Sequence, residues 1–480
     1  MSENQENLQS NLEELVHGGI GRLLVKYSWP ALVAMTLNAL YCVVDRFYIG
    51  QGCGTDAMAG LTLTYPLMMM FSAFGVLIGA GHSTVLSIKL GAKDLTACEK
   101  LVGQLVAFKL LFFITLPPLI FFNLDTVLGW CGADKVTPGA CQAAKDYLQI
   151  VIFPHLFAHL AFGLSAMMRA EGAAVRSMMC MVIGFGTNLI LDPILIFGCK
   201  MGIAGAAWAT NIAMFASCAF ASWAYIRGKT IIPFHFRRIG FYRGLCWRSL
   251  AVGFSPFFTT VLGSLISVSL SVALAKWSPN EAEATAHIAS LGVFQSVLIL
   301  VFTPIQGAQQ GLQPILGYNW GARNFRRVLD ATKTGFWATT IMCILACLVQ
   351  CVPPFPTWLA RCFVSADQPD LIRMAAHDLT ISNCMLWCIS INVVATTYFQ
   401  SIGRPTAAVF LSLLRQGICL LPCIWILPYF MEDKTFAVWL ALPISDVLCQ
   451  FATAIPFCLH LRFLSRVRPH RLPVGTPSTH

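Results

Sequence analysis

A carboxylate, an amide and a proline lie close together in one otherwise apolar stretch, NLILDPILIFG. Asn188 and Asp192 are four residues apart and therefore share one face of a helix. Pro193 has no backbone N–H, so the carbonyl group near Leu189 loses its usual helical donor. A carboxylate, an amide oxygen and a spare carbonyl oxygen together can hold a proton or a small hard cation.

A second polar stripe lies near the N-terminus. One helix face there carries Asn38, Tyr41 and Asp45, which recur at intervals of three and four residues. Thr210 can add a hydroxyl group to the same set. A structural alternative is that each aspartate caps a helix end or pairs with a local cation, such as Arg46 beside Asp45. We interpret the two stripes as one functional site.

The composition places these residues in a membrane. The chain has 480 residues, of which 57% are hydrophobic and only 11% are charged, whereas soluble domains are about a quarter charged. Runs of about 20 apolar residues suffice to cross a hydrocarbon core of ~30 Å. Twelve such runs occur, at 27–48, 57–81, 97–122, 146–168, 174–198, 201–226, 248–275, 284–308, 328–352, 374–400, 406–430 and 436–460. The sequence therefore predicts an all-α polytopic membrane protein with twelve transmembrane helices.

The basic residues predict how these helices are oriented. Most of the 32 Lys and Arg residues fall in the N-terminus, the even-numbered loops and the C-terminal tail. The odd-numbered loops hold only Lys135, Lys200, Lys276, Arg361 and Lys434. The positive-inside rule then predicts that both termini are cytoplasmic, in a multi-pass protein of the inner (cell) membrane. Helices 1 and 5 would both run outward, which brings their two aspartates to similar depths.

The chain also contains an internal echo. Residues 79–94 (GAGHSTVLSIKLGAKD) resemble residues 309–324 (QQGLQPILGYNWGARN) at a shift of 230, and RAEG at 169–172 resembles QSIG at 400–403. Such repeats predict two pseudo-symmetric six-helix lobes around a central cavity, with the substrate path between the lobes. The predicted parts are an N-terminal lobe (1–226), a cytoplasmic linker (227–247) and a C-terminal lobe with a basic cytoplasmic tail (248–480).

Other polar residues inside the spans have simpler interpretations. Arg415 and Asp446 lie on adjacent helices 11 and 12, where we expect a structural ion pair. The glutamine-rich stretch 306–313 either lines the cavity or forms hydrogen bonds between helices, and the sequence does not decide between these roles.

Two further pairs of residues were considered as a metal site and a disulfide. His155 and His159 have the spacing of a metal-binding helix face, but no third ligand is evident, so we expect no metal site. Cys131 and Cys141 share one loop, where we expect two free thiols rather than a disulfide.

The chain resembles the multidrug and toxic compound extrusion (MATE) family of bacterial transporters over nearly its whole length. The matching stretches are WPALVAMTLNALYCVVDRFYIG at 29–50, LTYPLMMMFSAFGVLIGAG at 63–81, MMRAEG at 167–172 and NLILDPILIFGCKMGIAGAAWAT at 188–210. The resemblance implies two six-helix lobes around a cavity. It also implies export of amphipathic, often cationic compounds in exchange for inward H⁺ or Na⁺.

The resemblance also implies roles for individual residues. In the N-terminal lobe of that family, the coupling site uses a Tyr and an Asp on helix 1, an Asn and an Asp on helix 5, and a Thr on helix 6. The matching residues of this chain are Tyr41, Asp45, Asn188, Asp192 and Thr210.

Other matched positions concern the first helix and the cavity wall. A helix-1 proline of the family, proposed as a bending point, matches Pro30, and a helix-4 Asn of the family is replaced here by Ser165. Further candidates for the cavity wall are Asn38, Gln306 and Gln309.

We therefore expect a secondary active antiporter that works by alternating access. It would act as a monomer in the lipid bilayer and transport small organic substrates. We expect no nucleic-acid partner, no metal and no cofactor other than the coupling ion. We also expect that it is not an enzyme. The alternative of the same wider fold is a lipid-linked sugar flippase, which would need several cationic groups in its cavity. Only Lys109 and Arg415 are basic residues deep inside spans, so we expect a neutral to acidic cavity. A membrane enzyme or receptor is the other class considered, and no motif supports it.

Overall fold

The computed structural model describes residues 14–131, 137–364 and 368–466. In that part of the chain the regular elements are helices, and no strand occurs. The α-helices are α2 (Ile20–Gly91), α3 (Leu95–Phe122), α4 (Leu124–Trp130), α5 (Pro138–Val151), α6 (His155–Ala170), α7 (Ala174–Pro193), α8 (Gly202–Ile226), α9 (Arg243–Trp277), α10 (Glu281–Gly321), α11 (Phe325–Cys351), α12 (Phe355–Arg361), α13 (Pro369–Asn383), α14 (Ile389–Ser401), α15 (Pro405–Leu413), α16 (Leu421–Ile426) and α17 (Lys434–Arg466). Short π-helical and 3₁₀ segments join some of them: η2 (Ile194–Gly198), η3 (Phe236–Arg238), η4 (Leu386–Cys388), η5 (Leu414–Leu420) and η6 (Leu427–Tyr429).

The transmembrane prediction is confirmed. Eleven helical segments in the described ranges are long and apolar enough to cross a membrane. Helices α5 and α6 form a twelfth span if they are counted together, although the pair is bent by 56° between Val151 and His155. Helix α2 holds two of the spans, Ile20–Tyr41 and Ala59–Gly91.

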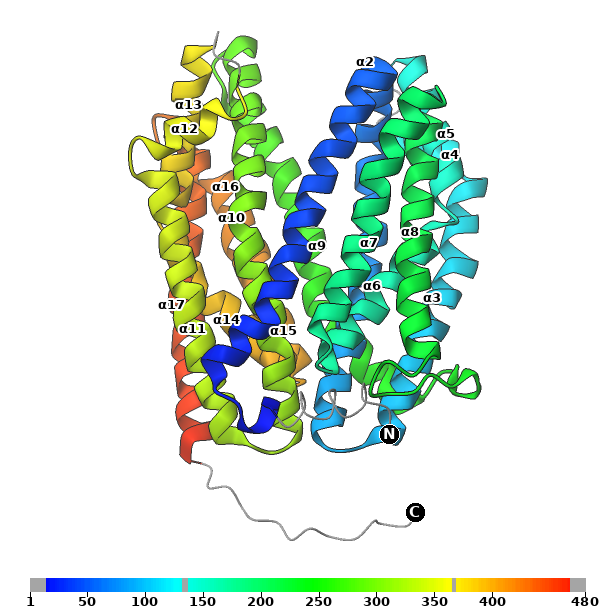
Figure 1. Cartoon of the computed structure of the whole chain (residues 1–480). Helices are drawn as coiled ribbons and strands as arrows, with labels where there is room; N and C mark the ends of the chain where they lie inside the picture. The colour runs from blue at the N-terminus through cyan, green and yellow to red at the C-terminus, as the bar shows by residue number, and fades with distance from the viewer. Residues whose placement is uncertain (1–13, 132–136, 365–367, 467–480) are drawn as a thin grey trace.

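Helix α2 must turn back on itself between its two spans. A straight helix of 72 residues would be about 108 Å long, more than three times the thickness of the hydrocarbon core. Just before the helix begins, Leu15 accepts a hydrogen bond from Asn319 Nδ2 (3.1 Å). At the other end of the helix, Gly91 packs against the carbonyl oxygen of Tyr318. Both ends of α2 therefore lie at the same end of the molecule, which we call the termini end (Figure 1).

Two helical bundles stand side by side in Figure 1, with α3–α8 in one and α11–α17 in the other. At the termini end α2 and α10 cross so closely that only glycine fits. A Cβ atom added at Gly91 would lie 2.0 Å from the Tyr318 oxygen, and one added at Gly321 would lie 1.9 Å from the Ile88 oxygen. Because 91 and 321, like 88 and 318, differ by the shift of the sequence echo, the crossing is pseudo-symmetric. The predicted fold class is confirmed, whereas the exact lobe boundaries remain a prediction.

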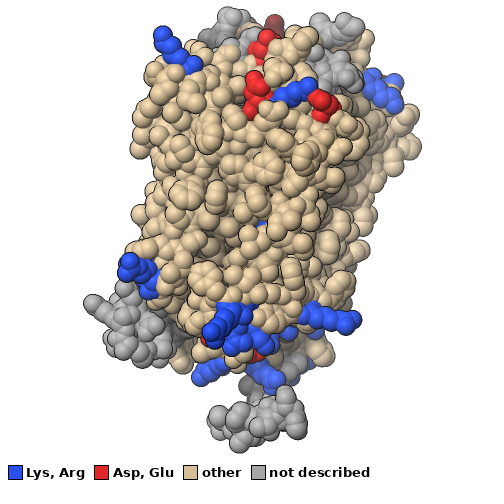
Figure 2. All heavy atoms as spheres, turned by 90° about the vertical axis from the view of Figure 1, so that its right-hand side faces the viewer, with Lys and Arg blue, Asp and Glu red and all other residues tan. Residues whose placement is uncertain are grey.

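The surface has the pattern of a protein embedded in lipid. Figure 2 shows a broad middle band of uncharged side chains, with charged side chains gathered toward the two ends. Helix α3 exposes large apolar side chains, including Ile114 (68% exposed) and Leu119 (62%). Exposed apolar surface of this extent would be a liability in water and is the ordinary outer face of a membrane protein.

The segment after α8 is attached to the first bundle by a buried carboxyl group. Glu171, in the turn between α6 and α7, accepts hydrogen bonds from Tyr225 Oη (2.7 Å) and from the backbone N–H groups of Ile231 (2.9 Å) and Ile232 (3.3 Å). Nearby, Arg176 donates to the Lys229 carbonyl. Burial outweighs these hydrogen bonds and raises the pKa of Glu171 to about 7.

Candidate functional site

A cavity of about 450 Å³ lies inside the first bundle. Its wall is formed by α2, α5, α6, α7 and α8, and every lining residue lies between positions 38 and 217. The sequence repeat had suggested a path between the two halves. The structure instead places this cavity within the N-terminal half, because the two spans of α2 enclose it together with α5–α8.

The predicted helix-5 pair is buried beside this cavity. Asp192 and Asn188 are 1% and 2% exposed, and Asn188 lines the cavity directly. The amide nitrogen of Asn188 donates to Asp192 Oδ1 (3.1 Å) and to Thr210 Oγ1 (3.4 Å). Pro193 ends α7, and the π-helical segment η2 follows it, as expected where a proline removes a backbone donor.

The helix-1 aspartate completes the group. Asp45 lines the cavity, is 9% exposed, and lies within hydrogen-bonding reach of the Asp192 carboxyl group. Asp192 Oδ2 and Asn188 Oδ1 accept no hydrogen bond from any described residue. Two facing carboxyl groups have no donor of their own when both are ionised. A proton or a cation between the two groups would therefore stabilise this arrangement.

The other two helix-1 candidates also form part of the wall. Tyr41 and Asn38 both line the cavity, and the Tyr41 ring stacks on Phe185 at 5.5 Å between ring centroids. Arg46, the suggested local partner of Asp45, has a side chain outside the described part of the structure. Asp192 takes part in none of the ion pairs found among the described residues.

Comparison with known proteins identifies the family. The MatE family model matches twice, over residues 30–194 and 256–426. The chain belongs to the MATE family of multidrug efflux transporters. It is similar to the multidrug export protein MepA of Staphylococcus aureus (strain MSSA476), with 25% identity over 440 residues that cover 90% of this chain and 92% of MepA. MepA of Staphylococcus haemolyticus (strain JCSC1435) is also 25% identical, over 437 residues with the same coverage.

Solved MATE structures share the fold. An outward-facing multidrug resistance MATE transporter of the MOP superfamily superposes with a TM-score of 0.86 at 19% identity, over 95% of this chain and 98% of that one. Structures of MATE described as bent and straight give nearly equal TM-scores of 0.86 and 0.85. The family match and the MepA relatives confirm the expectation of a membrane transporter rather than an enzyme.

Three predicted cavity residues of this MATE protein do not line the cavity. The hydroxyl group of Ser165 is fully buried and pairs with Ser177 Oγ (2.8 Å), so it is used between helices. Gln306 and Gln309 lie on α10, outside the group of helices that encloses the cavity. Pro30 lies inside α2 and is buried, as its assignment requires, and its role in bending remains a prediction.

The sequence reasoning missed part of the cavity wall. His155 and His159 line the cavity, although they were considered only as metal ligands. The described residues contain no group of three or more His, Cys, Asp or Glu that could hold a metal ion. Much of the remaining wall is methionine and aromatic side chains: Met68, Met69, Met181, Met214, Tyr65, Tyr147, Phe162 and Phe185. The methionine run within LTYPLMMM was a usable signal, because methionine-rich surfaces adapt to varied ligands.

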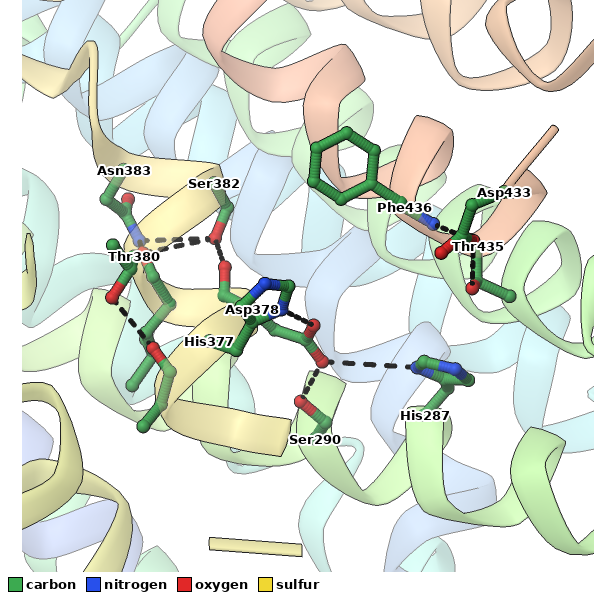
Figure 3. A network of polar contacts seen from close by, with 12 residues as sticks. His287, Ser290, His377, Asp378, Thr380, Ser382, Asn383, Asp433, Thr435 and Phe436 are labelled. Atoms are coloured by element: carbon green, nitrogen blue, oxygen red, sulfur yellow. Dashed lines mark hydrogen bonds and ion pairs between the residues drawn. The ribbon is translucent and has the colours of Figure 1, made fainter. Parts of the chain in front are cut away.

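The C-terminal half contains acids of a different kind. Arg415 Nε lies 3.2 Å from Asp446 Oδ1, as the sequence predicted for a structural pair. Asp378, which is 3% exposed, accepts a hydrogen bond from Ser290 Oγ (2.5 Å) and lies 4.0 Å from His287 Nδ1 (Figure 3). Each of these carboxyl groups thus has a donor or a basic group beside it.

The two cysteines that the sequence places in one outer loop have free thiols. Cys131 and Cys141 form no disulfide with each other or with another described cysteine.

Proposed function

We propose that this MATE protein is a secondary active antiporter that exports amphipathic, often cationic compounds in exchange for H⁺ or Na⁺. It would act as a monomer in the cell membrane, with both termini in the cytoplasm. The observation that carries this proposal is the pairing of Asp45, in the wall of a largely apolar cavity, with the buried Asp192. A second acidic pair of this kind is not found elsewhere among the described residues.

The geometry supports exchange at a single site. Asp45 lines the cavity, whereas Asp192 lies behind it, with Asn188 and Thr210 beside it. When a proton or Na⁺ sits between the carboxyl groups, the negative charge at the wall is reduced. When the ion leaves, Asp45 offers that charge to a cationic cargo. Ion and cargo then compete for the same carboxylates, which is the requirement for antiport.

The rest of the wall suits a varied apolar cargo. Methionine side chains are flexible and polarizable, and aromatic rings attract organic cations through their faces. A volume of about 450 Å³ is within the range of small-molecule pockets. Carboxylate, amide and hydroxyl oxygens suit Na⁺ as well as a proton, so the proposal names both ions.

The test is efflux from proteoliposomes under separate H⁺ and Na⁺ gradients. Asp45→Asn and Asp192→Asn keep the size and polarity of the side chains but cannot ionise. Each should abolish gradient-driven efflux at wild-type levels of inserted protein. The double variant should be little worse than either single variant, because the two residues act as one site. Asn188→Ala, which removes a ligand but no charge, should weaken coupling less.

A matched control is available in the other half of the chain. Asp378→Asn makes the same change at another buried carboxyl group, outside the cavity, and should leave coupling intact. Wild-type efflux from both Asp45→Asn and Asp192→Asn would show that these carboxylates are structural. Coupling would then have to be sought elsewhere.

A further inference from the structure

We propose that the cavity has a second, basic subsite at His155 and His159, which binds an acidic group of the cargo. The preferred cargo would then be a zwitterionic amphiphile, with its cationic group at Asp45 and its carboxylate at the two histidines. This inference rests on the proposed function, because it assumes that the cavity is the cargo site.

The two histidines lie where the fourth span is broken. His155 is the first residue of α6, at the 56° bend that separates α5 from α6. Its ring lies 5.0 Å from that of His159, edge to face, and both side chains line the cavity. His159 is only 5% exposed. His155 Nδ1 and His159 Nε2 have no hydrogen-bond partner among the described residues.

A buried lysine lies directly behind this pair. The side chain of Lys109 is fully buried, and its Nζ donates to the carbonyl oxygen of Gly75 (2.9 Å). Gly75 lines the cavity, and the His159 ring packs so tightly on it that an added Cβ would lie 2.6 Å from Nδ1. None of the ion pairs formed by described residues includes Lys109. Within the described part of the chain, Lys109 Nζ therefore has no carboxylate partner.

These features together favour an anion over a neutral ligand. Every histidine ring carries at least one N–H donor, and a buried donor without a partner is costly. His155 Nδ1 and His159 Nε2 are themselves closed off from the cavity, so an oxygen acceptor from the cargo would bind the ring nitrogens that face it. A negative charge on that acceptor would favour the protonated form of Lys109 nearby, and the start of α6 also favours a negative charge there. The side chains packed around the rings are apolar: Phe71 lies 5.6 Å from His155, and Phe112 lies 5.2 Å from His159.

The acidic and basic groups lie at different depths. Two neighbouring residues of α8 set the common depth. Asn211 Nδ2 donates to the Ile150 carbonyl (2.8 Å), and Thr210 Oγ1 accepts from Asn188 Nδ2 (3.4 Å). Ile150 and Asn188 therefore lie at about the same depth. Asp192 is four residues from that level in one direction, and His155 is five residues from it in the other. At 1.5 Å per residue the two groups are on the order of 10–15 Å apart, which suits the two ends of an elongated amphiphile.

The test compares a probe with its own ester. One probe is a fluorescent aromatic amphiphile with a tertiary amine and a carboxylate at that spacing, and the other is its methyl ester, which is only cationic. Binding of both is measured by fluorescence on the purified full-length protein in nanodiscs. Wild type should bind the acid at least tenfold more tightly than the ester. The double variant His155→Phe/His159→Phe should bind both probes equally, with affinity for the ester unchanged.

Further variants keep the result interpretable. His235→Phe, at an exposed histidine outside the cavity, is the matched control and should keep the wild-type preference. If the double Phe variant does not fold, the single variants His155→Phe and His159→Phe each remove one ring donor, and each should lose part of the preference. Equal binding of acid and ester by wild type, or an undiminished preference in the double variant, would overturn the basic subsite and leave the antiporter proposal standing. Failure of wild type to bind either probe would overturn the basic subsite, whereas the antiporter proposal is decided by efflux from Asp45→Asn and Asp192→Asn.

Discussion

The crossing of α2 and α10 gives a prediction whose size follows from the coordinates. A Cβ atom at residue 321 would lie 1.9 Å from the Ile88 oxygen, 2.8 Å from its carbonyl carbon and 3.0 Å from the Ala92 nitrogen. Real Cβ contacts are essentially never shorter than 3.0 Å. All three neighbours are backbone atoms, so no side-chain rotation relieves the clash. Gly321→Ala must push the two helices apart by about 1 Å.

This separation should destabilise the closed termini end. Forced overpacking costs about 1–3 kcal/mol, which corresponds to a shift of roughly 5–150-fold in a two-state equilibrium. The proposed alternating access requires this end to close, so we expect slower efflux and a larger population with the crossing open. Gly91→Ala faces the same contact from the other side. The double variant should therefore add little to either single variant.

Two measurements check this expectation. Hydrogen–deuterium exchange of the full-length protein in nanodiscs should increase at 88–92 and 318–322, and efflux from proteoliposomes should fall. Gly292→Ala is the matched control on the same helix, since an added Cβ there meets nothing within 4 Å. If Gly321→Ala exchanged and transported like Gly292→Ala, the crossing would not be part of the closing contact.

The remaining predictions concern topology, an ion pair and a pH-dependent attachment. Labelling of introduced reporters should place 227–247 in the cytoplasm and 123–144 outside, and outward labelling of 227–247 would refute the orientation. Arg415→Met should lower the free energy of unfolding by about 3–5 kcal/mol, because it leaves the buried Asp446 without its partner. Replacing both residues with apolar ones should restore most of the folded yield. Normal yield with no efflux in the single variant would instead assign the pair to the mechanism. The pKa of Glu171 is raised from 4.5 to about 7, so its contribution to stability is complete below pH ~4.5 and is lost as pH rises through ~7. Between pH 6 and 8 this loss is about 1 kcal/mol, and it should be absent in Glu171→Gln when thermal unfolding is followed across that range.

The sequence was sufficient for features that depend on one helix at a time. Apolar run length predicted the spans, and four-residue spacing predicted that Asn188 and Asp192 share a face, where they now form a hydrogen bond. Predicting that Asp45 lies at the same depth as Asp192 also required the membrane topology, because the depth of a residue depends on the direction in which its helix runs. The resemblance to the MATE family added the expectation that these residues meet, and the structure brings them together.

Features that depend on contacts between helices were not predictable in the same way. Residues 146–168 were predicted as one uniform span, whereas the helices begin at Pro138 and break before His155. Pro154 was a usable signal for that break. Spacing also could not show whether Gln306 and Gln309 face a cavity, because that depends on which helices enclose it.

The two halves share a backbone plan but differ in their electrostatics. In the C-terminal half, Asp446 is paired with Arg415, and Asp378 is hydrogen-bonded by Ser290 (Figure 3). Asp446 gains little from an added proton or cation, because Arg415 already balances its charge. In the N-terminal half, Asp192 faces another carboxyl group, so it gains the most from an ion. Under the proposed antiport, an ion gradient would act mainly on the N-terminal half, which meets the C-terminal half at the glycine crossing.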